Sequence, residues 1–291
     1  MIKRILSTCL LLSSINALAV PFTDIPCDVD VPSGLITNTI GYDVNDNLCD
    51  FKAEQLKLKV FKIAVCTQAP SFSRLNQPDF SSCSFIYNND TYSEITVSAS
   101  TGFNLSGLTK PAAGTYPYIL LVTSNDVKIK AQARFSSTLN PSTPSSRETY
   151  TSGGGSGSYC WTNGSVINYV GAPSKSNKGL SCGNAVDSSY GFNEINWASN
   201  SGNSDPSEPV PGGDSVRSLL TANLLLTTVK ADIIRTAYVN TLATPITITE
   251  NTNALKMSID ISTGATLVFN GVKIDWIEDA PFAYIIEPVN Q

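Results

Sequence analysis

The chain has 291 residues, 24 acidic and 19 basic side chains, a net charge of −5 and no histidine. A mildly acidic surface repels phosphate backbones and so argues against a nucleic-acid partner. Without histidine, Ser-His-Asp and Cys-His catalysis, histidine general bases and the usual zinc sites are excluded. No phosphate-binding loop or dinucleotide fingerprint occurs, so we predict a protein that is not an enzyme and has no cofactor.

Residues 1–19 have the three parts of a secretory signal peptide. Lys3 and Arg4 form a basic start, residues 5–12 an apolar stretch, and residues 17–19 (Ala-Leu-Ala) a small-x-small cleavage site. We therefore predict a mature chain that starts at Val20 and is exported to the periplasm, the cell surface or the extracellular space. The apolar stretch is too short to span a bilayer and no later segment is long enough, so we do not expect a membrane-spanning protein.

Seven cysteines are present, and Cys9 lies in the signal peptide. The remaining six are an even number in an exported chain, which indicates disulfide bonds formed in an oxidising compartment. Six cysteines allow many connectivities, and proximity along the sequence favours the pairs Cys27–Cys49, Cys66–Cys83 and Cys160–Cys182.

The stretch DVNDNLCDFKAE (43–54) carries oxygen-bearing residues at calcium-loop spacing. Asp43, Asn45 and Asn47 stand at the first, third and fifth positions, and Glu54 stands at the twelfth. Leu48, however, occupies the position that requires glycine for the sharp turn. The favoured interpretation is an Asx-rich turn before a strand, with a calcium site as the alternative.

Period-two alternation predicts antiparallel strands in the N-terminal β part, residues 20–136. In DVKIKAQARF (126–135), apolar residues alternate with Lys, Gln and Arg. LKLKVFKIAVC (56–66) also alternates, but slips by one residue at Val60-Phe61, which predicts a β-bulge. Further strands are expected near residues 83–87, 95–99, 103–108 and 116–123.

Residues 137–214 interrupt the alternation and form a predicted insertion or linker. A Ser-, Thr-, Pro- and Gly-rich stretch opens it, and an aromatic-rich segment around the predicted Cys160–Cys182 disulfide follows. Tyr and Trp offer rigid contact area with a polar edge, so this segment is the candidate binding surface. Its candidate residues are Tyr159, Trp161, Tyr169, Tyr190 and Trp197. For any single one of these side chains, packing in a small core around the disulfide is the favoured interpretation, and a surface contact is the alternative.

The C-terminal β part, residues 215–291, also alternates. LKMSIDIS (255–262) predicts a strand, and Asn270-Gly271 between two strand-like runs predicts a hairpin. Residues 215–234 fit either a helix after Asp214 or a strand, and the β-branched second half favours the strand. The final run, PFAYIIEPV, is expected to be an ordinary strand of its own sheet, with strand addition to a neighbouring subunit as the alternative.

Two groups of carboxylates are the candidates for hydrolytic chemistry, which needs an acid and a base or nucleophile. They are Glu194, Asp205 and Glu208 near the aromatic segment, and Asp275, Glu278 and Asp279 near Trp276. Solvated loop residues are the favoured interpretation of both groups.

These patterns predict an all-β fold: an antiparallel, disulfide-stapled β-sandwich, single or double, with a loop-rich aromatic insertion. We expect an exported cell-surface or extracellular protein with a structural or adhesive role, and self-assembly as one form of that role. Its partner would be itself, another surface protein or a glycan. A carbohydrate-binding module is the alternative, and a carboxylate-dependent polysaccharide-degrading enzyme is the less favoured one.

Overall fold

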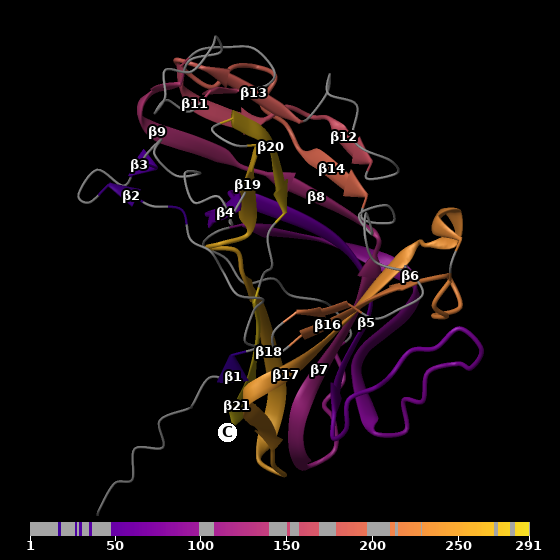
Figure 1. Ribbon diagram of the computed structural model, residues 1–291. Helices are drawn as coiled ribbons and strands as arrows, with labels where there is room; N and C mark the ends of the chain where they lie inside the picture. The colour runs from indigo at the N-terminus through magenta and orange to yellow at the C-terminus, as the bar shows by residue number, and fades with distance from the viewer. Residues whose placement is uncertain are drawn as a thin grey trace, which may run out of the picture.

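The computed structural model describes fourteen stretches of the chain, shown in Figure 1 as coloured ribbon. They are residues 17–18, 27, 29–30, 35–36, 48–98, 108–139, 150–151, 157–168, 179–196, 210–212, 215–227, 229–270, 273–279 and 283–290. These residues form strands, turns and one short 3-10 helix, Lys230–Asp232. The predicted all-β class is confirmed.

The largest sheet has nine strands and is built around β5 (Gln55–Cys66). The strand β6 (Cys83–Ser98) runs along one side of β5. On the other side, β8 (Asp126–Lys130) pairs with the first part of β5, and β7 (Gly114–Ser124) pairs with the second part of β5. The strand order is β12 (Val166–Asn168), β14 (Asn193–Asn196), β8 (Asp126–Lys130), β5, β7 (Gly114–Ser124), β17 (Arg235–Ile248), β16 (Ser215–Leu220) and β15 (Val210–Gly212).

Three smaller sheets accompany it. One has the order β13 (Leu180–Gly183), β11 (Gly157–Thr162), β9 (Gln132–Leu139), β3 (Leu35–Ile36) and β2 (Val29–Asp30). The second has the order β10 (Tyr150–Thr151), β20 (Lys273–Asp279), β19 (Ala265–Asn270) and β4 (Leu48–Phe51). The third has the order β1 (Ala17–Leu18), β21 (Ala283–Asn290) and β18 (Thr252–Asp260). The first and third of these sheets lie at opposite ends of the molecule (Figure 1).

Most neighbouring strands are antiparallel, and none of the sheets is closed. Parallel pairs join β10 to β20, β12 to β14 and β3 to β9. Strands from the three predicted segments of the chain pair with one another: β17 lies beside β7, β19 beside β4, and β11 beside β9.

The bulge predicted at Val60-Phe61 is confirmed, and it divides β5 into two kinds of strand. Pairing shifts between Val60 and Lys62 on both sides of β5. Before the bulge, Leu56 and Leu58 are buried while the lysines between them point outward. After the bulge, the run Ile63–Cys66 is buried on both faces, as expected for a central strand covered on each side.

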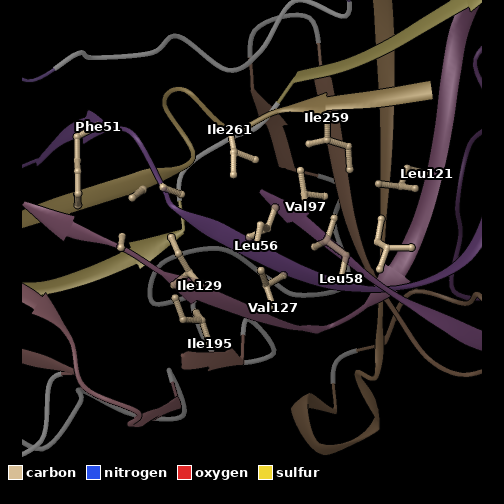
Figure 2. Packing of buried hydrophobic residues seen from close by; sticks show 14 of the residues in the cluster. Phe51, Leu56, Leu58, Val97, Leu121, Val127, Ile129, Ile195, Ile259 and Ile261 are labelled. Carbon is tan, nitrogen blue, oxygen red and sulfur yellow. The ribbon is translucent and has the colours of Figure 1, made fainter. Parts of the chain in front are cut away.

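The main core fills one face of the large sheet. Leu56 and Leu58 of β5 and Ile129 of β8 pack toward Ile259 and Ile261 at the end of β18 (Figure 2). A second core lies on the other face, where the strand residues Leu120 and Leu220 are covered by loop residues. Those covering residues are Phe72, Leu224 and Leu226.

That second core explains why residues 215–234 are only partly strand. The strand β16 ends at Leu220, and Leu224 then adopts a positive φ of 60°. The Thr221 hydroxyl accepts hydrogen bonds from the backbone N–H groups of Asn223 and Leu225, closing a turn. Residues after Leu220 therefore leave the sheet to cover it, so the prediction of a strand throughout this segment was wrong.

Other local predictions agree with the structure. β19 and β20 are antiparallel, with Asn270 opposite Lys273, while residues 271 and 272 lie outside the described residues. Most of the strand expected at 103–108 also lies outside them. The three predicted disulfides, Cys27–Cys49, Cys66–Cys83 and Cys160–Cys182, are confirmed. The last two join residues that lie directly opposite each other on adjacent strands.

Candidate functional site

The outward face of β5, β8 and β9 brings cations and aromatic rings together. Alternation along these strands sends Lys57, Lys59, Lys128, Lys130 and Arg134 to the same side, away from the main core. Rings lie over four of them: Phe192 over Lys57 at 4.6 Å, Tyr92 over Lys59 at 5.3 Å, Tyr190 over Lys130 at 4.2 Å and Tyr159 over Arg134 at 5.2 Å. We call these nine side chains the cation–aromatic face.

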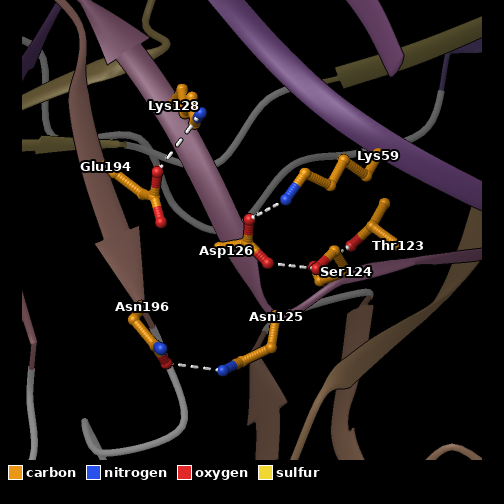
Figure 3. A network of polar contacts seen from close by, with 8 residues as sticks. All are labelled: Lys59, Thr123, Ser124, Asn125, Asp126, Lys128, Glu194 and Asn196. Carbon is orange, nitrogen blue, oxygen red and sulfur yellow. Dashed lines mark hydrogen bonds and ion pairs between the residues drawn. The ribbon is translucent and has the colours of Figure 1, made fainter. Parts of the chain in front are cut away.

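Carboxylates balance the charge of this face (Figure 3). The ammonium of Lys59 lies 2.5 Å from the Asp126 carboxylate, and that of Lys128 lies 3.2 Å from Glu194. Burial alone would raise the pKa of Asp126, but hydrogen bonds from Lys59 and Ser124 outweigh it and bring the pKa below its usual range. The same hydrogen bond raises the pKa of Lys59. Lys59 and Lys128 are thus paired with carboxylates on this face.

Tyr190, a predicted contact residue, belongs to the cation–aromatic face and is half-buried. Burial raises the pKa of its hydroxyl, and the nearby Glu54 carboxylate raises it further. Glu54 itself accepts a hydrogen bond from the Gln132 amide. The other members of the predicted calcium set, Asp43, Asn45 and Asn47, lie outside the described residues.

Tyr159 and Trp161, two further predicted contact residues, differ sharply in exposure. Tyr159 lies opposite Arg134 on the cation–aromatic face and is half-buried. Trp161 points to the same side, opposite Gln132, but is only 1% exposed. Its indole N–H donates to the Ser189 hydroxyl at 2.9 Å, so the loop that follows β13 covers the ring. Trp161 is therefore part of a small core beneath that loop.

Asn193, which the sequence patterns did not single out, ties the aromatic segment to the rest of the protein. Its buried amide nitrogen donates to the carbonyls of Gly179 (2.8 Å) and Ile277 (3.4 Å). Its amide oxygen accepts from the backbone N–H groups of Asn163 (3.1 Å) and Ser165 (3.3 Å). Gly179 has a φ of 68°, and a Cβ there would lie 2.4 Å from the Asn193 amide nitrogen, so both features require glycine.

Tyr169 and Trp197 lie outside the described residues. Two rings of the cation–aromatic face, Tyr92 and Phe192, were absent from the sequence-based set. Tyr92 comes from β6, far away in sequence, and is 49% exposed. No local pattern marks it, because only the pairing of β5 with β6 brings it beside Lys59.

The candidate hydrolytic carboxylates are distributed over different environments. Glu194 is paired with Lys128 on the cation–aromatic face, while Asp205 and Glu208 lie outside the described residues. Asp275, Glu278 and Asp279 belong to β20. Asp279 and the neighbouring Asp50 are buried, and the Thr266 hydroxyl donates to Asp50 at 2.6 Å.

Glu278 lies in an environment that disfavours its charge. Although the residue keeps some exposed surface, burial of its carboxyl raises the pKa well above the ordinary value of 4.5, and the charges of Asp279 and Asp50 raise it further. A carboxyl whose pKa is raised in the folded state contributes most stability below its unfolded pKa. That contribution is lost as the pH rises through the folded pKa.

We expect Glu278→Gln to have little effect on the melting temperature near pH 4 and to raise it progressively above that pH. Between the unfolded and folded pKa values, the gain in unfolding free energy should grow by about 1.4 kcal/mol per pH unit. Thermal unfolding from pH 4 to pH 8 measures this. Glu250→Gln, at an exposed turn, is the control and should show no such pH trend. A gain that is equal at every pH would contradict the raised pKa of the Glu278 carboxyl.

Within the described ranges, no group of three or more His, Cys, Asp or Glu side chains is arranged to hold a metal ion. The same part of the chain contains no helix with the length and apolarity needed to cross a bilayer. Comparison with models of known families, with curated proteins and with solved structures gave no match. Function must therefore be inferred from the fold and the surface.

Proposed function

We propose that this is an exported, non-enzymatic protein of the cell surface or extracellular space, with a structural or adhesive role of which self-association is one form. The cross-strand disulfides carry the proposal. Each of the six cysteines outside the signal peptide is paired, and such pairing is typical of proteins in an oxidising compartment. The large sheet and the smaller sheets against its apolar face would serve as the layers of a rigid, sandwich-like body.

Cell fractionation combined with thiol labelling tests the export of the protein. The wild-type chain should appear outside the cytoplasm, start at Val20 and contain no thiol that reacts with an alkylating reagent before reduction. A matched control replaces Leu10 and Leu11 with arginine, which interrupts the apolar stretch of the signal peptide. That variant should stay in the cytoplasm with reactive thiols. A wild-type chain found in the cytoplasm, reduced and uncleaved, would rule the proposal out.

The cation–aromatic face supports a second candidate function, the binding of a glycan. Aromatic rings can stack on sugar rings, and charged or hydrogen-bonding groups beside them can form hydrogen bonds with the sugar hydroxyls. Tyr92, which is 49% exposed, is the most accessible of the four rings of this face for such stacking. Retention on a glycan array that is lost in Tyr92→Ala would favour this function. Release of reducing ends from a polysaccharide would instead point to the enzyme.

A further inference from the structure

The last strand of the chain, β21, is paired on both sides. On one side β18 runs antiparallel to it, with Met257 opposite Ile286. On the other side lies β1, with Ala17 opposite Ile286 and Leu18 opposite Ile285. Ala17 and Leu18 are the third-last and second-last residues of the predicted signal peptide, which ends at Ala19. The leader therefore occupies an edge of the sheet that the mature chain would expose.

Removal of β1 would make β21 an edge strand. Only two strands of the sheet, β18 and β21, would remain, and the side of β21 that pairs with β1 would lose its partner. The freed edge of β21 contains the run Tyr284-Ile285-Ile286, an apolar sequence of high strand propensity. Long apolar edges with unpaired backbone groups recruit other strands.

Four other edge strands in the described part of the chain are less suited to pairing. β12 has three residues, β15 contains Pro211, and β6 carries the polar run Asn88-Asn89-Asp90. The outer edge of β18 carries Lys256, whose side chain is 63% exposed. Lysine, proline and short length are the devices that protect sheet edges from pairing. The strand β21, by contrast, contains no lysine, and an apolar run lies near its centre.

We propose that, once the leader is removed, β21 pairs antiparallel with β21 of a second copy across a two-fold axis. The pairing with β1 shows that this edge accepts an antiparallel strand. Two identical edges become antiparallel automatically across a two-fold axis, and one contact covers both freed edges. Glu287 is offset within each copy by Lys256 at 3.9 Å, so the copies do not meet through uncompensated charge. Pro288, which lacks an N–H, limits the pairing to the residues before it.

This inference depends on the proposed export, because it requires cleavage of the leader. Light scattering on the oxidised mature chain, from Val20 onward, should show a monomer that becomes a dimer as concentration rises. The mature chain extended to begin at Ala17 retains β1 and should remain monomeric. A mature chain that stays monomeric would overturn the proposal. Growth into open-ended species would overturn the two-fold pairing, because a two-fold contact closes.

Hydrogen exchange locates the contact without any substitution. Amide exchange at the edge-facing amides of residues 283–287 should slow by about tenfold or more between monomeric and dimeric concentrations, since these amides gain partners. Exchange in β12, at another edge, should not change. A dimer that forms without slower exchange in residues 283–287 uses another surface, and the proposal would then be wrong.

Ile285→Lys supplies a third arm. Its side chain is half-buried near the expected axis, so two copies would bring two like charges together and weaken dimerisation by about tenfold. Val166→Lys, at a 56% exposed position on the edge strand β12, is the matched control and should dimerise normally. Equal dimerisation of both variants would contradict the proposal. If the chain is exported and oxidised but stays monomeric, the proposed dimer is wrong and the proposed export stands. If the chain is not exported, the proposed function itself is wrong.

Discussion

Replacing Trp161 with alanine should lower the free energy of unfolding by about 3–5 kcal/mol. The indole is only 1% exposed, so its removal leaves a large cavity between the sheet and the loop after β13. The substitution also leaves the Ser189 hydroxyl without its donor. A Cβ on Gly183, the last residue of β13, would lie 3.2 Å from the ring, so the end of β13 also packs closely against Trp161.

Urea denaturation of the oxidised protein measures this loss. Tyr92→Ala is the control: it also removes an aromatic ring, but from a position on β6 that is 49% exposed. The control should lose about 1 kcal/mol or less. If Trp161→Ala lost no more unfolding free energy than this control, the indole would be a contact residue at the surface, which is the alternative interpretation of the sequence.

Asn193→Leu should be the second most damaging substitution, with an expected loss of about 3 kcal/mol in unfolding free energy. Leucine has the same branched arrangement of side-chain heavy atoms as asparagine but cannot form its four hydrogen bonds. The backbone N–H groups of Asn163 and Ser165 would lose their acceptor, and the carbonyls of Gly179 and Ile277 their donor. Buried groups left without partners account for most of the expected cost.

The effect of Asn193→Leu should be local before it is global. Amide exchange at Asn163 and Ser165 should accelerate even under conditions in which β5 and β7 remain protected. Asn184→Ala, at an exposed position in the neighbouring loop, is the matched control and should behave as wild type. If Asn193→Leu were as stable as the control, the four hydrogen bonds would contribute nothing to the fold.

Disulfide connectivity and strand positions were predictable because they depend on nearby residues. The confirmed pairs join cysteines 17 to 22 residues apart, which short connections bring together, in two of the three cases on adjacent strands. Alternation in residues 126–135 and 255–262 reflects one buried and one outward face, and so identifies strands directly. The one-residue slip at Val60-Phe61 identified the bulge for the same reason.

Exposure of the candidate site residues was not predictable in this way. Alternation places Trp161 and Tyr159 on the same side of β11, and only the loop that folds over Trp161 separates a buried ring from an accessible one. Nothing local distinguishes Asn193 from the many other asparagines, since its partners lie 14 to 84 residues away. The raised pKa of Glu278 likewise depends on burial of its carboxyl and, to a smaller degree, on the charges of Asp279 and of Asp50, more than two hundred residues earlier.

By itself, then, the sequence determined the β class, the disulfides, the bulge and the features that predict export, because each depends on period, spacing or a local motif. Tertiary structure decided which strands became neighbours and which side chains were covered. It placed β17 beside β7, Tyr92 beside Lys59, and Ala17 and Leu18 on the edge of β21. Such contacts join residues distant in the chain, and their energies depend on burial, which no local pattern contains.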